Sequence, residues 1–427
     1  MNRRVLSLSA LGFAGVLALT ACGSSGGGGG SSADGTVTIK FVAADYGDPT
    51  QGNSSQQYWD SVASAFEKAN PKIKVDVTVI NWNDIDAKVQ TMVQNHDFPD
   101  VLQTGGYANF VPDNLLYTAD QVASPSTLAN FIPSFLDNGK INGKQYGIPF
   151  DSSTRMFIYN TAIFKKAGIT SAPKTWQDIA TDAQIIKSKG LSSTPYGLPL
   201  GPEEAQAESY LWELGNGGGP VDSSGSFALN SPQNVQTFQW LKSNLVSKGL
   251  TYPNPGTVDR TSGAWADFEA GKTAMINGHP GILQTLKQKN VPYAVAQIPG
   301  RTGPLPSTLG VADWVMAFKA NNHAAQIKKW VDFMYSDANT MKFLDEYNLM
   351  PVTKTDYSVM TTNAKYADLK PWIEQLPSAK FYPLSNEAWD TVSAQIKKEI
   401  GTAATGDPAK VLGDLQNKAQ QAEKAAQ

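Results

Sequence analysis

The chain is 427 residues long, 41% of them hydrophobic and 17% charged, with a formal net charge of −3. This length is too great for one hydrophobic core and predicts two domains, and the lack of a basic block argues against nucleic acid as a partner. Cys22 is the only cysteine, which excludes disulfides, a cysteine-ligated metal and, in the body of the chain, a thiol nucleophile. The three histidines lie far apart in sequence, so we expect no metal and no cofactor.

The first 35 residues predict export and anchoring. Arg3 and Arg4 precede an apolar stretch from Val5 to Leu19, which is typical of a secretory signal and too short for a membrane span of about 20 residues. The run from Leu19 to Cys22 resembles the lipobox of bacterial lipoproteins, in which the cysteine is lipidated and becomes the mature N-terminus. The resemblance implies a signal peptide over 1–21, a lipidated Cys22 and a flexible Gly/Ser tether over 22–35.

Regular hydrophobic patterns predict a parallel α/β unit at the start of the body. Alternation predicts strands at 37–42 and 73–79, helical spacing predicts helices at 54–70 and 82–95, and an apolar run predicts a strand at 98–102. This order of elements is typical of a parallel sheet. Ligands of such sheets bind at the carboxyl ends of the strands, so we expect 44–47, 81–82 and 104–107 to lie on a ligand-facing rim.

The rest of the chain mixes helices with short strands. The segment from 161 to 287 is predicted to be rich in helix. We expect strands at 273–276, 293–298 and 313–319, a helix at 324–335, and a final helical region over 386–426 that pauses near 402–408. Trp59, Trp240 and Trp330 lie on apolar helix faces, and we expect them in the core.

Short motifs follow one another in a fixed order along the body, at 147–150, 157–160, 164–168, 173–176, 268–278, 309–315, 330–334 and 349–352. Together they resemble the extracellular solute-binding proteins of carbohydrate ABC importers, a family that includes maltodextrin and trehalose binders. The spacing fits over essentially the whole mature chain.

The resemblance implies two α/β lobes of the periplasmic-binding-protein type, joined by three hinge crossings, with a ligand cleft between them. The crossings are expected near 150–151, 309–313 and 349–351. The N-terminal lobe then comprises 36–150 and 310–348, and the C-terminal lobe 151–309 and 349–427. Such a protein is a monomer and not an enzyme. It binds a sugar or oligosaccharide, is held at the extracytoplasmic face of the bacterial membrane by its lipid, and delivers its ligand to a membrane permease.

Sugars need partners for their hydroxyls and apolar rings for their C–H faces, so acids, amides and aromatic residues near the cleft are candidates. Some follow predicted strands and turns, and others lie at the crossings. Glu208 and Trp212 are one helical turn apart, and Trp389 lies where the resembling maltodextrin binders place a ring. The full set of expected ligand-binding residues is Asp45, Tyr46, Tyr107, Asp151, Glu208, Trp212, Asn277, His279, Asp313, Trp314 and Trp389.

Two other functions stay open. A receptor of the same fold could take a peptide, a polyamine or a phosphate ester, although Arg155, Arg260 and Arg301 are the only arginines in the body and weigh against a multiply charged anion. A glycoside hydrolase needs two placed carboxyl groups. Glu203, Glu204 and Glu208 could be imagined in that role, but Glu203 and Glu204 are adjacent and point in different directions on a helix.

Overall fold

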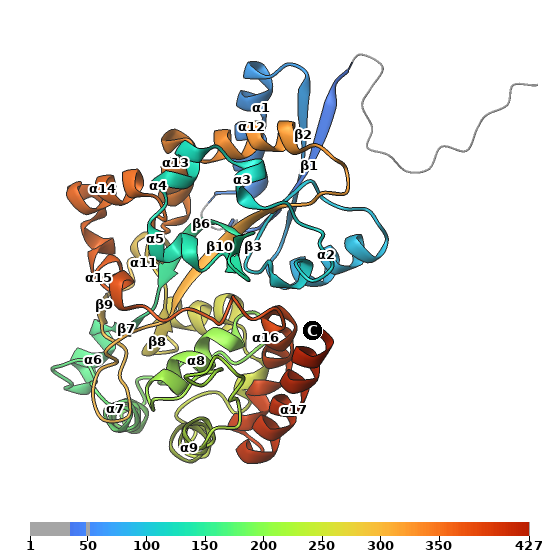
Figure 1. Cartoon of the computed structure of the whole chain (residues 1–427). Coiled ribbons are helices and arrows are strands. Elements are labelled where there is room, and N and C mark those ends of the chain that lie inside the picture. Colours follow the sequence, from blue (N-terminus) through green and yellow to red (C-terminus); the bar gives the residue numbers. More distant parts are fainter. Residues whose placement is uncertain (1–34, 48–51, 427) are drawn as a thin grey trace, which may run out of the picture.

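The computed structural model describes residues 35–47 and 52–426. It has two α/β lobes, one above the other in Figure 1, each built on its own sheet. The two-lobed fold expected from the sequence is confirmed. The predictions for the signal peptide, for Cys22 and for the tether up to residue 34 lie outside the described residues.

The N-terminal lobe is built on a five-stranded sheet in the order β2-β1-β3-β10-β6. β1 pairs in parallel with both β2 and β3, which confirms the predicted parallel unit, and β10 is antiparallel to β3 and to β6. The strands are β1 (Val37–Ala44), β2 (Ile73–Ile80), β3 (Val101–Thr104), β6 (Ile148–Thr154) and β10 (Gly310–Ala317). A small hairpin of β4 (Lys140–Ile141) and β5 (Lys144–Gln145) comes shortly before β6 in the chain.

Helices cover this sheet. α1 begins after Ser54, whose side chain caps the helix by accepting from Gln57 N, and its buried face includes Trp59 and Phe66. The helices of this lobe are α1 (Ser55–Ala69), α2 (Ile85–Gln94), η2 (Ala108–Phe110), α3 (Ala119–Val122), α4 (Pro125–Asn130), α5 (Pro133–Asp137), α12 (Ala324–Met334) and α13 (Asp337–Tyr347).

Aromatic packing between α1, β1 and α12 forms the centre of the N-terminal lobe. Trp330 is 0% exposed, and its ring centroid lies 5.5 Å from that of Phe41 and 5.2 Å from that of Phe66. Trp59 packs edge-on against Phe41. The expectation that Trp59 and Trp330 are core residues is confirmed, whereas Trp240 is only partly buried.

We expect Trp330→Ala to destabilise the protein by about 3–5 kcal/mol, because it removes a large buried ring and leaves a cavity that its neighbours fill only in part. Urea unfolding followed by far-UV circular dichroism measures this change. Trp330→Phe is the control, and its free energy of unfolding should fall by clearly less than that of Trp330→Ala. Equal losses for the two variants would contradict the cavity explanation.

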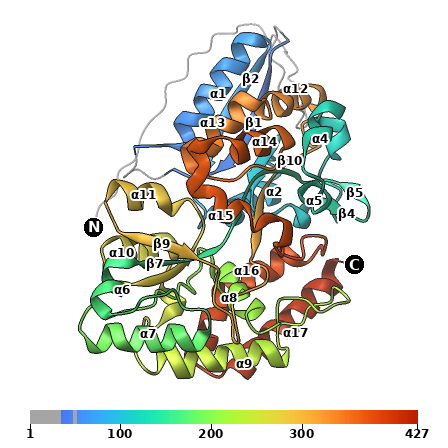
Figure 2. The same cartoon turned by 90° about the vertical axis from the view of Figure 1, so that its left-hand side faces the viewer.

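The C-terminal lobe is built on a three-stranded antiparallel sheet in the order β8-β7-β9. The strands are β7 (Met156–Asn160), β8 (Met275–Gly278) and β9 (Tyr293–Ala296), so β8 begins two residues later than predicted. The predicted richness in helix is confirmed by α6 (Thr161–Ala167), α7 (Trp176–Ser188), α8 (Ala205–Leu214), α9 (Pro232–Leu241), η5 (Arg260–Trp265), α10 (Ala266–Glu269) and α11 (Ile282–Gln288). Figure 2 shows α16 (Trp389–Glu399) and α17 (Pro408–Ala426) completing the lobe beside α8 and α9.

The chain passes from one sheet to the other between β6 and β7, and it returns between β9 (Tyr293–Ala296) and β10. β6 ends at Thr154 and β7 begins at Met156, so Arg155 lies in the first crossing, and the chain returns into β10 at Gly310. The segment after α13 stays with the N-terminal lobe: Ile132 N donates to Val352 O at 2.9 Å, and Phe131 forms a bridge with Thr353.

α14 (Lys354–Thr362) and α15 (Lys370–Ile373) follow this segment. The sequence placed the third crossing at 349–351. The sequence motif at 349–352 predicts a turn, but it contains no information on which other segment pairs with the backbone of that turn. We therefore propose that the third crossing follows α15, where Lys380 bridges Leu309 before the chain enters α16.

Candidate functional site

A pair of acids lies where β6 and β10 run side by side. Asp151 is directly opposite Asp313 in the antiparallel register, which brings two like charges together. The Tyr46 hydroxyl, at the end of β1, lies 2.5 Å from Asp313 Oδ2 and 3.1 Å from Asp151 Oδ2, and it accepts a hydrogen bond from Gln103 Nε2 at 2.7 Å. One hydroxyl hydrogen cannot serve two carboxylates at once, so this arrangement favours a proton on one of the acids.

The electrostatics of the pair agree with its geometry. Burial raises the pKa of Asp151 well above its ordinary value, and the charge of Asp313 raises it further. Burial also raises the pKa of Asp313 to about 6, although the hydrogen bond from Tyr46 and the charge of Arg155 oppose that rise. The pair therefore holds a proton more tightly in the folded protein than in the unfolded chain.

This proton makes stability depend on pH. An acid whose folded pKa is raised contributes most at low pH, and its contribution falls as the pH rises from the unfolded value near 4 through about 6. Asparagine has no charge to bury. We therefore expect the free energy of unfolding of Asp313→Asn to rise by about 1–2 kcal/mol relative to that of the wild type as the pH increases from 5 to 8. Thermal unfolding of both proteins across this range measures the difference. A difference that is constant with pH would contradict the shared proton.

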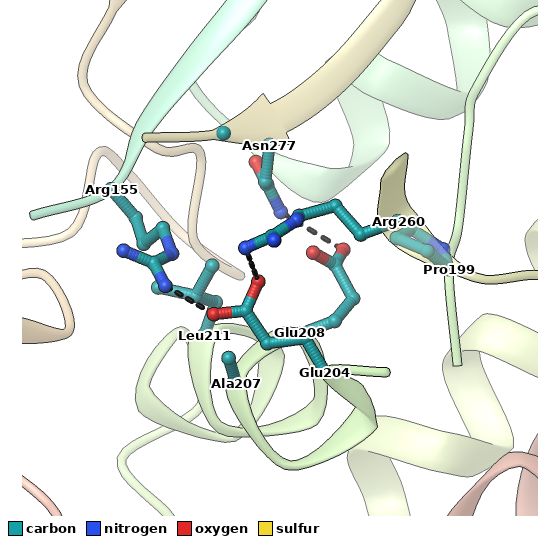
Figure 3. A pocket seen from close by; sticks show the side chains of 9 residues that line it. Arg155, Pro199, Glu204, Ala207, Glu208, Leu211, Arg260 and Asn277 are labelled. Carbon is teal, nitrogen blue, oxygen red and sulfur yellow. Dashed lines mark hydrogen bonds and ion pairs between the residues drawn. The ribbon is translucent and has the colours of Figure 1, made fainter. Parts of the chain in front are cut away.

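Figure 3 shows an ion-pair network of arginines and glutamates, and this network lies near enough to Asp313 for its charges to act on the pKa of that acid. Glu204, just before α8, binds both Arg155 and Arg260, and Arg260 Nη2 also lies 2.9 Å from Glu203 Oε1. Glu203 accepts from Thr261 N at 2.8 Å as well. Burial alone would raise the pKa of Glu204, but Arg155 and Arg260 outweigh it and hold that pKa below its ordinary value. Two guanidinium groups and two carboxylates therefore neutralise one another.

A second buried network starts from Glu208 on α8. Its Oε1 accepts from Trp212 Nε1 at 2.8 Å, from Asn277 Nδ2 at 3.0 Å and from the Tyr196 hydroxyl at 3.2 Å. Burial raises the pKa of Glu208 to about 7, against the opposing effect of these three hydrogen bonds. The structure thus joins Asn277 to Glu208 and Trp212, the pair that the sequence predicts to share one helix face.

A small cavity lies between the two networks. Its free volume is about 10 Å³, room for about one water-sized group. It is lined by Arg155, Pro199, Glu204, Ala207, Glu208, Leu211, Arg260, Asn277 and Gly278. The arrangement therefore leaves space for a single hydroxyl, and a larger ligand needs the lining side chains to move.

His279 lies near the arginines but has a structural contact of its own. Its Nδ1 accepts from Gly281 N at 3.1 Å, and its ring packs 4.7 Å from that of Trp265. Burial lowers its pKa well below the ordinary value, and the charges of Arg260 and Arg155 lower it further. Both the direction of this pKa shift and the hydrogen bond that Nδ1 accepts favour the neutral imidazole.

The expected stacking rings of the C-terminal lobe lie in rows of aromatic residues. Trp389 is 3% exposed and stacks with Tyr382 and with Phe227, at centroid distances of 5.1 and 6.5 Å. Trp212 is also 3% exposed and packs against Trp176, 5.3 Å away. Trp389 is thus buried among other rings in this arrangement.

The remaining candidates lie at the N-terminal lobe. Tyr107 and Trp314 are both fully buried, with ring centroids 5.3 Å apart, and the Tyr107 hydroxyl donates to Asn138 O. Asp45 accepts from Gly47 N at 2.8 Å within its own turn. The structure does not bring these three side chains into the cluster around Asp151, and their contact with ligand stays a prediction.

Several site residues were missed by the sequence. Arg155, Glu204 and Arg260 form the ion-pair network although 49 and 56 residues separate Glu204 from its partners, and no short motif joins them. Tyr382 stacks on Trp389, and its buried hydroxyl lies close to Glu204 and Arg155. Trp82 packs edge-on against Tyr46 at 5.3 Å. The one sequence feature that pointed to Trp82 was its position in the segment 81–82, which the sequence places on the predicted ligand-facing rim.

The lobes also meet outside the cavity, along α16. Asp390 accepts from Asn109 N at 3.2 Å and from Ala108 N, both in η2 of the N-terminal lobe. Asn142 Nδ2 donates to Glu387 Oε1 at 2.9 Å, and Lys397 Nζ lies 3.4 Å from Asp86 Oδ2. These contacts hold the two lobes against each other.

The chain matches the family model of bacterial extracellular solute-binding proteins over residues 50–341. It belongs to this family. A relative in Brucella abortus (strain 2308), whose name says only that it is a binding protein, is 28% identical over 400 residues, covering 91% of this chain and 94% of the relative. The sn-glycerol-3-phosphate-binding periplasmic protein of Brucella melitensis biotype 1 is 27% identical over 229 residues, 51% of this chain and 51% of the relative.

Solved structures show the same fold. The solute-binding protein of an ABC transporter from Thermotoga lettingae, bound with α-D-tagatose, has a TM-score of 0.77 and 19% sequence identity, and the match covers 90% of this chain and 99% of that chain. Identity this low supports the fold alone. In the part of the chain that the structure describes, no group of three or more His, Cys, Asp or Glu side chains is placed to hold a metal ion.

Proposed function

We propose that this chain is the substrate-binding lipoprotein of an ABC importer and that it captures a sugar or oligosaccharide between its lobes. The observation that carries the proposal is the cluster of Tyr46, Asp151 and Asp313 beside the cavity lined by Glu208 and Asn277. Hydroxyl groups need such paired acids and amides, since each unpaired buried hydroxyl costs about 1–3 kcal/mol. The T. lettingae structure, with its bound sugar, supports the same reading.

Capture and delivery work through the hinge. A ligand favours the closed arrangement only through contacts that it makes better there, and the Asp390 contacts supply part of the closed interface without ligand. We propose that a membrane permease recognises the closed shape and that the receptor acts as a monomer that catalyses no reaction.

We also propose that Cys22 carries the lipid that holds the protein at the extracytoplasmic face of the membrane, on the basis of its lipobox-like setting. Among the described residues, no helix is long and apolar enough to cross a bilayer. Mass spectrometry of the protein from a membrane fraction, with Cys22→Ala as control, tests the anchor.

A second candidate is a receptor of the same fold for a phosphate ester. The Brucella melitensis relative favours it, because its name gives sn-glycerol 3-phosphate as ligand. The hydrolase alternative has less support, since Glu203 and Glu204 are tied to arginines and are not free to exchange protons during catalysis.

The deciding experiment uses residues 36–427. Tryptophan fluorescence and melting temperature are recorded with mono-, di- and oligosaccharides, with polyamines, peptides and glycerol 3-phosphate as controls. A saturable shift with one class of sugar, and no breakdown of that sugar, supports the receptor. A shift with a control alone keeps the fold and overturns the carbohydrate assignment.

A further inference from the structure

Two residues that line the cavity each carry a buried polar atom with no hydrogen-bond partner among the described residues. Asn277 Oδ1 and Arg260 Nε are both buried and unpaired, and both residues line the cavity of about 10 Å³. Figure 3 shows their side chains entering the same small space from different elements, Asn277 from β8 and Arg260 from η5. A buried polar atom left without a partner costs about 1–3 kcal/mol, so each is a candidate contact for ligand.

The orientation of the Asn277 amide follows from its network. Its nitrogen donates to Glu208 Oε1 and to the Tyr196 hydroxyl, each at 3.0 Å, and the same Oε1 also accepts from Trp212 Nε1. The oxygen therefore occupies the other position, and Asn277 is only 5% exposed. An amide oxygen accepts and cannot donate, so its partner must bring an O–H or N–H group.

The free atom of Arg260 has the opposite requirement. Its two terminal nitrogens are committed to Glu204 and Glu203, and its guanidinium carbon lies 4.7 Å from the centroid of the Trp265 ring. Among the three guanidinium nitrogens, Nε alone has no partner in the described part of the chain, and its N–H group can only donate. Because the charge of Arg260 is already balanced, this nitrogen offers one hydrogen bond and not a free positive charge.

We propose that Asn277 Oδ1 and Arg260 Nε form a hydroxyl-reading pair, through which the site selects a neutral polyhydroxyl ligand over its phosphate ester and over its amine. This inference rests on the proposed function and deepens it. One hydroxyl oxygen can donate to Asn277 and accept from Arg260, and it fits the free volume of the cavity. A dianionic phosphate cannot donate to Asn277, and an ammonium group cannot accept from Arg260. Either charged group leaves one buried atom unpaired.

The experiment is isothermal titration of the full-length protein, purified in detergent, with three matched sets of ligands. Each set holds a neutral sugar together with its amino and phosphate derivatives at the one position whose hydroxyl the deoxyglucose series described below identifies, starting from D-glucose, D-galactose and the disaccharide cellobiose. We expect the neutral member to bind at least about tenfold more tightly than either charged member, the factor that one unpaired buried atom produces. A charged member that binds as tightly as the neutral one overturns the pair but leaves a sugar receptor.

Arg260→Lys removes the Nε–H group and keeps the positive charge. It should weaken binding of the neutral sugar about tenfold, whereas Arg301→Lys, at an exposed arginine bound to Asn216 and Gln236, should leave it unchanged. Repeating the titration with 2-, 3-, 4- and 6-deoxyglucose distinguishes a direct hydrogen bond between Arg260 and a sugar hydroxyl from a purely structural role of Arg260. The variant's loss should vanish for the one analogue that lacks the hydroxyl being read, and an equal loss for all four overturns the pair.

Absence of binding by every sugar at millimolar concentration contradicts the pair as well, because a hydroxyl-reading site should register at least one neutral sugar. If glycerol 3-phosphate, a peptide or a polyamine then binds in their place, the proposed carbohydrate function itself fails. The two failures are therefore distinguishable.

Discussion

Gly106→Ala should shift the protein from the closed arrangement to an open one. A Cβ atom built at Gly106 would lie 2.5 Å from Asp390 Oδ1, 2.8 Å from its Cγ and 3.0 Å from Oδ2. The carboxylate would have to leave Asn109 N and Ala108 N, which are its partners across the lobes. Loss of these charge-assisted hydrogen bonds costs about 2 kcal/mol, or roughly a thirtyfold shift between closed and open forms. Small-angle scattering, through the radius of gyration, measures the shift.

Two controls separate this effect from a general cost of the added methyl group. Gly303→Ala places a Cβ where nothing lies within 4 Å and should leave the radius of gyration unchanged. Asp390→Ala removes the obstructed carboxylate, so adding Gly106→Ala to that variant should cause little further opening. A double variant that opens by the sum of the two single effects would mean that Gly106 and Asp390 do not act on each other.

The local elements of the fold could be predicted because their hydrophobic patterns are regular. β1 and β2 alternate, α1 has a clear apolar face and a capping serine, and the structure confirms all three. β3 begins at Val101 and not at Phe98, because an apolar run alone does not mark where ladder pairing begins. The antiparallel insertion of β10 between β3 and β6 was beyond prediction from pattern, since those partners are far apart in sequence.

The candidate site shows the same division. Asp151 and Asp313 were found because they lie at crossings implied by the family resemblance, and Glu208 with Trp212 because one helical turn separates them. The arginine–glutamate network and Tyr382 were not found, since each contact joins distant segments that only the folded chain brings together. Trp389 is expected to offer a ring face to ligand, and its contact with ligand stays a prediction; its stacking with Tyr382 and Phe227 joins segments that are distant in sequence.

Arg155→Met should destabilise the protein by about 3–5 kcal/mol. Arg155 is 4% exposed in the crossing between β6 and β7, where it donates to Ser153 Oγ at 2.7 Å and pairs with Glu204. Methionine keeps the apolar stem and removes the charge, so Glu204 stays largely buried with Arg260 as its one remaining cationic partner. Chemical unfolding at pH 7 measures the loss. A loss below about 1 kcal/mol would mean that the buried carboxylate of Glu204 does not depend on Arg155 for its stabilisation.

The dependence of this loss on pH and on a second substitution identifies its cause. In the wild type the pKa of Glu204 is lowered, so the stability that Glu204 contributes is present above the unfolded pKa and lost as the pH falls. Without Arg155, burial should raise that pKa, so protonation at low pH relieves the variant and its deficit should shrink between pH 7 and pH 4. Adding Glu204→Met should likewise recover part of the loss at pH 7, because no uncompensated carboxylate then stays buried beside the crossing. A deficit that is constant with pH and additive in the double variant would point to lost packing around Arg155 and not to the buried charge.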